Sequence, residues 1–260
     1  MSHIESLVMF ENITKACRYL LCNYPGATFV QEYLDSRIER ETQELFQFGY
    51  YPGIDEFHLL TDLLGEDIFL KHKLIWPKNI EDSLGPRVVN FSYFDHYPLI
   101  MPFQDTYGNI AGLVGRTFLD DKEMKIKKIA KYKNTTPFKK GNYLFGLWCN
   151  KREIIDQNSV YIVEGQFDVM KAMEKGIRNI VGIGTNTLSS YQFSVISRYA
   201  SNLIMILDND EAGVKGRKRA LDKFGKLANI QNFYIPEIYK DIDEYLTKCD
   251  DELPSFIVKD

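Results

Sequence analysis

The feature that most constrains the fold is a regular alternation of apolar and amphipathic segments in the second half of the chain. From residue 159 onward, the apolar runs SVYIVE, NIVGIG, NLIMILD and NFYIP alternate with the helix-like segments FDVMKAMEKG, SSYQFSVISRYA and EAGVKGRKRALDKFGKLAN. The segment DIDEYLTK follows the last run. Strands that alternate with helices of this length are typical of a parallel sheet with crossover helices. We therefore predict an α/β domain over residues 156–260.

The first half of the chain has a mixed pattern. ENITKACRYLLCNY, ATFVQEYLDSR and IDEFHLLTDLLG carry apolar residues at helical spacing, so the first ninety residues are predicted to be mostly helical. Near residue 98 the period changes, because PLIMPFQ and IAGLVGRTFL flank the turn-forming sequence DTYGN and thus predict a β-hairpin. Residues 1–155 are therefore expected to form a mixed helical and β-hairpin subdomain of the α+β class.

Composition excludes several classes of protein. The chain has 260 residues, of which 45% are hydrophobic and 26% charged, which is typical of a globular core. No segment approaches the roughly 20 apolar residues of a membrane span, and the N-terminus lacks a signal-peptide pattern. We expect a cytoplasmic protein without a membrane partner. The 4 cysteines and 4 histidines do not converge at the short spacings that zinc requires, so no zinc is expected.

The formal net charge of −4 conceals strong local segregation. Residues 122–140 contain eight lysines and one acid, and residues 215–226 contain six basic residues and one acid. Local fields rather than net charge attract a polyanion into a groove. Each basic run by itself is more often a solvated face than a binding site.

Acidic residues follow three of the predicted strands. They are Glu164 and Asp168 after the first strand, Asp208 and Asp210 after the third, and Asp241, Asp243 and Glu244 after the last. Ligand sites in parallel sheets gather at the carboxyl ends of the strands, and hard divalent cations prefer oxygen ligands. Asp210 and Asp243 could instead be helix N-caps, and Glu164 could pair with a lysine. Three acidic clusters at three strand ends together favour a metal site.

Five segments carry a resemblance to a known family. VEGQFDVM and LDNDEAG resemble the E-G-x-x-D and D-x-D elements of the Toprim domain. Three upstream segments, ATFVQEYLDSRIERETQELFQFGYYP, PLIMPFQDTYGNIAGLVGR and KYKNTTPFKKGNYLFGL, are similar to those that precede this domain in DnaG-type bacterial DNA primases. The resemblance covers nearly the whole chain. It implies a Toprim parallel sheet with helices on both faces, preceded by the helical and hairpin subdomain of a primase catalytic core.

The resemblance also implies an activity and a set of site residues. A primase is a nucleotidyltransferase, a DNA-directed RNA polymerase that makes short RNA primers from ribonucleoside triphosphates on single-stranded DNA during replication. By position, Asp208 and Asp210 would bind Mg²⁺ or Mn²⁺, and Glu164 would be a further ligand or the base. Further acidic positions of the family match Asp168, Asp241 and Asp243, and nucleotide- and template-binding positions match Arg116, Lys131, Lys133 and Asn134. Relatives often have an apolar residue at the position of Lys133.

The chain also departs from the family pattern. The zinc-binding module and the helicase-docking domain that accompany this core have no counterpart in the sequence. We therefore expect either a replicative helicase or a separate zinc-binding protein as partner, or a compact phage-encoded primase, in a bacterial or phage-infected bacterial cell.

Three other functions stay open. A Toprim-type nuclease would use the same acids but leaves the primase-like upstream half unexplained. A type I topoisomerase would need a nucleophilic tyrosine in further domains. A non-catalytic DNA-binding accessory protein of replication would have no need of the intact set of acids.

Overall fold

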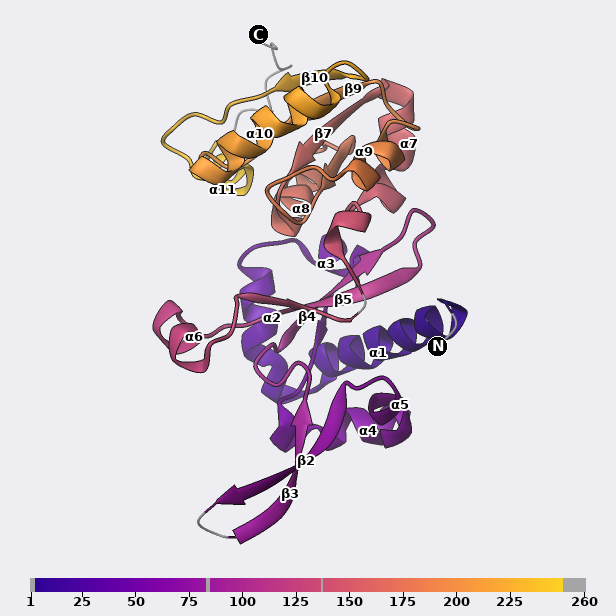
Figure 1. The fold of residues 1–260 in the computed structure, drawn as a ribbon, viewed down its shortest axis with the longest axis vertical. Helices are drawn as coiled ribbons and strands as arrows, with labels where there is room; N and C mark the ends of the chain where they lie inside the picture. The colour runs from indigo at the N-terminus through magenta and orange to yellow at the C-terminus, as the bar shows by residue number, and fades with distance from the viewer. Residues whose placement is uncertain (1–2, 83–84, 137, 250–260) are drawn as a thin grey trace. The chain divides into compact units, whose positions relative to one another are not determined.

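The computed structural model describes residues 3–82, 85–136 and 138–249 (Figure 1). The chain divides into two compact units, the first comprising Met1–Phe103 with Ile110–Phe138 and the second Gln104–Asn109 with Lys139–Asp260. The boundary predicted at residues 155/156 falls inside α7 (Leu147–Gln157), which is part of the second unit. The division into functional domains 1–155 and 156–260 stays a prediction.

The first unit combines helices with a small sheet. Its helices are α1 (His3–Asn23), α2 (Thr28–Asp35), α3 (Arg40–Leu45), α4 (His58–Leu64), α5 (Glu66–Lys71) and α6 (Asp121–Lys127), with 3₁₀ turns at Pro25–Ala27 and Ile54–Glu56. Its strands are β1 (Gly49–Tyr50), β2 (Ile75–Asp82), β3 (Gly85–Ser92), β4 (Leu99–Gln104), β5 (Ile110–Arg116) and β6 (Tyr132–Asn134). Strands β1, β4, β5 and β6 form one sheet in that order, and within the described part of the chain β2 pairs only with β3.

The predicted hairpin around DTYGN is confirmed as β4 and β5. Every residue of β4 is buried, because α1 covers this sheet through contacts with β1 and β5. The approach is close at Gly49, where an added Cβ would lie 2.5 Å from the Cβ of Cys17 on α1. A larger residue at position 49 would therefore push the helix off the sheet.

The prediction that the first ninety residues are mostly helical is wrong for residues 75–92. This segment forms the antiparallel strands β2 and β3, paired from Ile75↔Ser92 to Asp82↔Gly85. Most of its described side chains are exposed, so the strands lack the alternation of apolar and polar residues that a half-buried sheet imposes on a sequence. Because the sequence lacks this alternation, the two strands were not predicted from it.

The second unit is a parallel sheet flanked by helices. Its strands are β7 (Ser159–Val163), β8 (Ile180–Gly182), β9 (Asn202–Met205) and β10 (Asn229–Asn232), in the spatial order β10-β9-β7-β8. Its helices are α7, α8 (Gln166–Glu174), α9 (Ser190–Ile196), α10 (Glu211–Phe224) and α11 (Ile242–Lys248), with a 3₁₀ turn at Lys140–Asn142. All described strand pairs of this sheet are parallel, which confirms the predicted α/β class.

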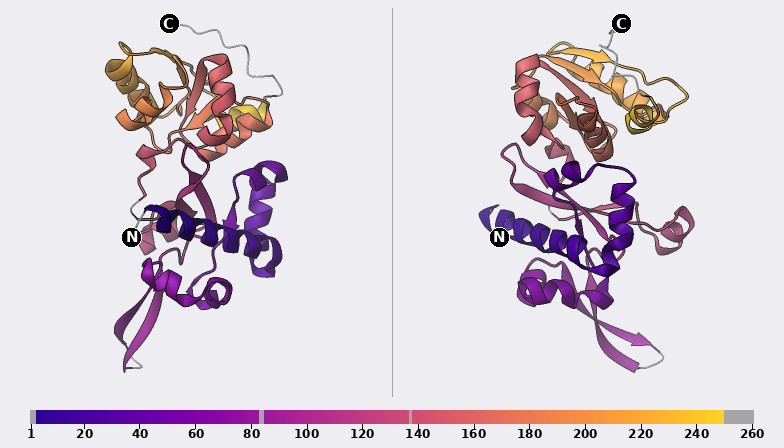
Figure 2. Two further views of the ribbon diagram at one scale, coloured as in Figure 1. Left: turned by 90° about the vertical axis from the view of Figure 1, so that its right-hand side faces the viewer. Right: turned by 180° about the vertical axis from the view of Figure 1, so that it is seen from behind.

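Helices cover both faces of the parallel sheet, as the two opposite views show (Figures 1 and 2). Alternate residues of β7 and β9, including Val160, Ile162, Leu203 and Met205, pack in one core with residues of α7, α9 and α10. Helices α8 and α11 contact each other. The last strand, β10, lies earlier than predicted: it covers Asn229–Asn232, in register with Asn202–Met205 of β9, and overlaps the predicted run NFYIP only at Asn232. In the described part of the chain, no helix combines the length and apolar character needed to cross a bilayer.

Candidate active site

The acids predicted to form a site belong to the carboxyl end of the parallel sheet. Glu164 follows β7 directly, and Asp168 lies in the first turn of α8. The loop between β9 and α10 carries Asp208 and Asp210, and Asp241 and Asp243 lie at the start of α11. We call these six residues the acidic edge.

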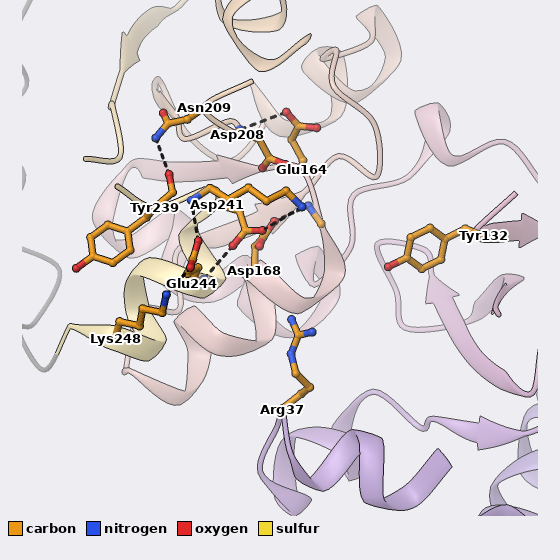
Figure 3. Close-up of polar contacts among 12 residues, drawn as sticks. Arg37, Tyr132, Glu164, Asp168, Asp208, Asn209, Tyr239, Asp241, Glu244 and Lys248 are labelled. Carbon is orange, nitrogen blue, oxygen red and sulfur yellow. Dashed lines mark hydrogen bonds and ion pairs between the residues drawn. The ribbon is translucent and has the colours of Figure 1, made fainter. Parts of the chain in front are cut away.

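The structure brings Glu164 and Asp208 together through neighbouring strands. Strands β7 and β9 pair side by side, and beyond the end of β9 the N–H of Ile206 still donates to the Ile162 carbonyl at 2.8 Å. Two residues later, the N–H of Asp208 donates to Glu164 Oε1 at 3.3 Å (Figure 3). Strand pairing therefore fixes the spacing of two acids that are far apart in the sequence.

Burial changes the protonation of these two carboxyls. Desolvation, reinforced by the charges of Asp208 and Asp210, raises the pKa of Glu164 to about 7. Desolvation, with the nearby charge of Asp241, raises the pKa of Asp208 to about 6. Both shifts arise because a carboxylate loses hydration on burial and is repelled by its like-charged neighbours. A cation placed among these groups would favour their charged forms.

Asp168 is the most enclosed of the acids, with 7% of its surface exposed. Its Oδ2 accepts a hydrogen bond from the Gly165 N–H at 2.7 Å, which satisfies a backbone donor at the start of α8. Desolvation still dominates and raises the pKa of Asp168 to about 8, with contributions from Asp208, Asp241 and Asp243. Figure 3 shows Asp168 and Asp241 as near neighbours.

Two acids of the edge are helix N-caps. Asp210 Oδ1 accepts from the Gly213 N–H at 2.8 Å at the start of α10, and Asp241 Oδ1 accepts from the Glu244 N–H at 2.9 Å at the start of α11. The capping alternative considered for Asp210 is thus correct. For α11 the cap is Asp241 and not Asp243, which is buried in the first turn. Capping uses one carboxylate oxygen of each residue, and the second oxygen of Asp241 lies 3.9 Å from Lys240 Nζ.

Sequence reasoning missed the residues that hold the Asp208 loop in place. Buried Arg217 donates from Nη1 to the Leu207 carbonyl at 2.5 Å. Asn209 Nδ2 donates to the Tyr239 carbonyl at 2.9 Å (Figure 3). Gly213 lets α10 approach, because a Cβ there would lie 2.1 Å from the Asp208 carbonyl oxygen. Arg217 was treated as part of a basic run. A signal was available, since it lies on the stripe of Gly213, Gly216, Ala220 and Phe224 that α10 buries.

The ligands of the acidic edge suit a hard divalent cation, because they are carboxylate oxygens that burial has partly removed from water. The arrangement is not a finished coordination site. Within the described ranges, no group of three or more His, Cys, Asp or Glu side chains is placed to hold a metal ion. In three of the six acids, namely Asp168, Asp210 and Asp241, one carboxylate oxygen accepts a hydrogen bond from a backbone N–H at the start of a helix.

The predicted nucleotide- and template-binding residues lie on β5 and β6 of the first unit. Arg116 pairs with Tyr132 across the strands, donates to its hydroxyl at 3.0 Å, and stacks 4.6 Å from the ring centre of Tyr33. Asn134 lies two residues from Tyr132 and shares its face of β6. Its buried Oδ1 has no hydrogen-bond partner among the described residues.

The lysines of this group differ in their surroundings. Lys131 is exposed, with Nζ 5.9 Å from the ring centre of Tyr132. Lys133 lies on the other face of β6, where its Nζ donates to the Tyr93 carbonyl at 2.7 Å and lies 4.1 Å from the Tyr93 ring centre. Desolvation lowers the pKa of Lys133. Its predicted role in nucleotide binding stays a prediction.

Two family models match the chain. The model for the N-terminal domain of the DNA primase catalytic core matches residues 19–151, and a Toprim-like model matches residues 161–246. Among curated proteins, the DNA primase of Aquifex aeolicus is 29% identical over 220 residues, which cover 83% of this chain and 41% of that protein. The chain thus spans less than half the length of this relative.

Solved structures give the same likeness. The zinc-binding and RNA polymerase domains of the Aquifex aeolicus primase superpose with a TM-score of 0.74 at 28% identity, covering 95% of this chain and 59% of that one. The RNA polymerase domain of Mycobacterium tuberculosis primase DnaG gives a TM-score of 0.75 at 24% identity, covering 95% and 80%. At that identity the second likeness shows the fold alone.

Proposed function

Because this chain belongs to the family of DNA primase catalytic cores, we propose that it is a DNA-directed RNA polymerase that makes short RNA primers on single-stranded DNA. The observation that carries the proposal is the acidic edge at the end of a Toprim-like sheet, with Glu164 and Asp208 joined across neighbouring strands. The upstream half supports polymerisation over hydrolysis, because the primase-core model covers residues 19–151.

The reaction joins a primer 3′-hydroxyl to the α-phosphate of a ribonucleoside triphosphate and releases pyrophosphate. Bound Mg²⁺ or Mn²⁺ would neutralise the charge on the attacking and leaving oxygens. We assign the cation to Asp208 and Asp210, with Asp243 and the neighbouring Asp168 and Asp241 completing the negative surroundings. Binding requires these carboxylates to be ionised, which the cation itself favours.

Glu164 has a second role in the proposal. Its pKa of about 7 in the metal-free protein lies near working pH, where a general base is most effective. Glu164 is therefore either a further ligand or the group that accepts the proton of the attacking hydroxyl. In the first unit, Arg116, Lys131 and Asn134 hold the phosphates and bases of nucleotide and template, with Lys133 beside them.

The partners follow from the family. The template is single-stranded DNA, the substrates are ribonucleoside triphosphates, and a replicative helicase or a separate zinc-binding protein acts with the core. The place of action is the cytoplasm of a bacterial or phage-infected bacterial cell.

Primer synthesis tests the proposal. Purified protein, single-stranded DNA and labelled ribonucleotides are incubated with Mg²⁺ or Mn²⁺, and the products are sized on a denaturing gel. Glu164→Gln and Asp208→Ala should abolish the short RNA products. Asp222→Asn, which removes an exposed acid of α10, should leave them intact. Metal-dependent loss of the DNA without RNA synthesis would identify a nuclease, and the absence of both reactions would reject a self-sufficient polymerase.

A further inference from the structure

The β2–β3 ribbon has no part in the proposed chemistry and carries unusual side chains. The ribbon extends away from the helices and the sheet of its own unit (Figures 1 and 2). Among the residues that the structure describes, its two strands pair only with each other, over the register from Ile75↔Ser92 to Asp82↔Gly85. An isolated two-stranded ribbon is marginally stable in water, so large apolar side chains left exposed on it require an explanation.

One face of the ribbon displays a pair of aromatic rings. Trp76 and Phe91 are direct cross-strand partners, with ring centres 6.2 Å apart and ring planes only 17° from parallel. Trp76 is 36% exposed and Phe91 39% exposed. Lys78 lies on the same face, with Nζ 5.5 Å from the ring centre of Phe91. Cross-strand pairing of the two rings stabilises the ribbon, which accounts for the contact between the rings but not for their exposure.

A cavity of about 810 Å³ adjoins this face, and Trp76 belongs to both. The volume lies in the range of pockets that enclose small organic ligands, which includes a nucleobase with its sugar. The walls combine apolar side chains with hydroxyl and cationic groups. They include Met9, Phe10, Lys73, Trp76, Thr135 and Thr136.

The charges around the cavity favour an anionic partner. Lys71 and Lys73 lie in the cavity lining, and Lys78 lies beside Phe91 on the ribbon. Glu5 is an acid in this lining, and its carboxylate lies 3.9 Å from Lys71 Nζ. Glu81 lies on the opposite face of the ribbon, because side chains alternate along a strand. The partner that fits must offer flat apolar rings and negative charge together.

Single-stranded nucleic acid has this chemistry. Its bases stack on exposed aromatic rings, and its phosphates lie against lysines that flank the rings. We propose that Trp76, Phe91, Lys78, Lys73 and the adjoining cavity form a binding site for single-stranded DNA, which we call the ribbon site. One base enters the cavity against Trp76, and the flanking phosphates contact Lys73 and Lys78. The proposal rests on the proposed function in one respect, because it takes the bound single-stranded DNA to be the template for primer synthesis.

Tryptophan fluorescence tests the ribbon site directly. The chain has 2 tryptophans, so Trp148→Phe leaves Trp76 as the reporter. We expect a deoxyoligonucleotide of about 16 nucleotides to quench its emission saturably, in chelator and without nucleotides, so that catalysis plays no part. In fluorescence anisotropy with a labelled oligonucleotide, Phe91→Leu and Trp76→Leu should each weaken binding at least about fivefold.

Matched controls separate binding from ribbon stability. Val88→Ala trims an exposed side chain on the opposite face of the ribbon, and Lys15→Gln removes an exposed lysine of α1. Both should bind DNA as the unaltered chain does, whereas Lys78→Gln should bind less tightly. Hydrogen exchange of the ribbon amides in Phe91→Leu checks that the ribbon is still formed.

Three results would overturn the proposal. They are unchanged Trp76 emission on DNA binding, tighter quenching by RNA of equal length than by DNA, and a dimer in solution that Phe91→Leu dissociates. The last would assign the face to a second copy of the chain. Failure of the proposed function is distinguishable, because Asp208→Ala should lose primer synthesis while Trp76 quenching persists.

Discussion

Three carboxyl groups of the acidic edge, those of Glu164, Asp168 and Asp208, hold protons more tightly than free carboxyls do. Burial is the main cause, and the like charges of the other acids add to it. Raised pKa values are expected in a cation site without its cation. Closely spaced carboxylates repel one another when ionised, and the same concentration of negative charge attracts a divalent ion. Removal of one of these carboxylates should therefore preserve or raise the stability of the metal-free protein and lower its primer synthesis.

Asp208→Asn should separate the two responses. Loss of the carboxylate removes a proposed metal ligand, so primer synthesis should fall by at least about a hundredfold, or ~2.7 kcal/mol of barrier. Without metal, Asp208→Asn should have a melting temperature no lower than that of the unaltered chain, because one of the mutually repelling carboxylates has been removed. Millimolar Mg²⁺ should raise the melting temperature of the unaltered chain and leave that of Asp208→Asn unchanged. Equal Mg²⁺ stabilisation of both proteins would contradict the assignment.

The stability of the metal-free protein should fall as pH rises. An acid whose folded-state pKa lies above its unfolded value binds protons more tightly when folded, so it favours folding below the unfolded pKa and loses that effect through the folded pKa. For Asp168 this window runs from the ordinary value of 3.8 to about 8. Urea unfolding in chelator between pH 5 and about 8.5 should show the decline. Asp168→Asn should flatten it, and saturating Mg²⁺ should do the same.

At the scale of elements, two helices begin on acids of the site. Asp210 caps α10 and Asp241 caps α11, so the residues proposed to gather around a cation also fix where these helices start. Each cap satisfies a backbone N–H at the N-terminal end of a helix dipole, where negative charge is favoured. A substitution there therefore changes folding and chemistry together unless it is chosen to separate them.

Asp210→Ser and Asp210→Ala are such a pair. Serine keeps an oxygen for the Gly213 N–H and loses the carboxylate, whereas alanine loses both. Asp210→Ala should lower the free energy of unfolding by about 1 kcal/mol, and Asp210→Ser should leave it nearly unchanged. Both should lose primer synthesis. Urea titrations measure the free energy of unfolding of each variant, and the gel assay measures primer synthesis. Full activity in Asp210→Ser would show that this residue acts only as a helix cap.

The elements also show what the sequence could and could not predict. The α/β half was predicted because each of its buried strands is a short apolar run, and the acids Glu164 and Asp208 follow two of these runs directly. The ribbon escaped prediction because its exposed faces impose no period. The burial of Arg217 was not predicted, because it depends on which face of α10 packs against the sheet. Counting Arg217 among the basic residues hid its place beside the buried glycines of that face.

At the scale of the whole chain, a net charge of −4 coexists with a lysine-rich α6 and a basic α10. Acids concentrated at the end of one sheet give a negative site, and lysines elsewhere give positive surfaces. Under the proposed function, this segregation would allow an overall acidic protein to bind a polyanion while repelling it from the proposed metal ligands until a cation is present.

Salt dependence measures the lysine contribution. Lys125 and Lys127 are exposed on α6, and we expect each to contact one phosphate of single-stranded DNA. Lys125→Gln and Lys127→Gln should each lower the slope of log affinity against log salt concentration by about 0.7. Lys15→Gln serves again as the control. An unchanged slope in both α6 variants would exclude this helix from the DNA-binding surface.

The link between Glu164 and Asp208 has a consequence for the order of folding. The two residues are 44 positions apart, and the intervening chain contains α8, β8, α9 and β9. Because a contact of such long sequence separation forms only after the intervening loop has closed, the site cannot exist in a nascent or partly collapsed chain. In refolding experiments, recovery of primer synthesis should trail recovery of helical circular dichroism and coincide with protection of the β9 amides. The carboxylates proposed to be catalytic would thereby report the completion of the sheet.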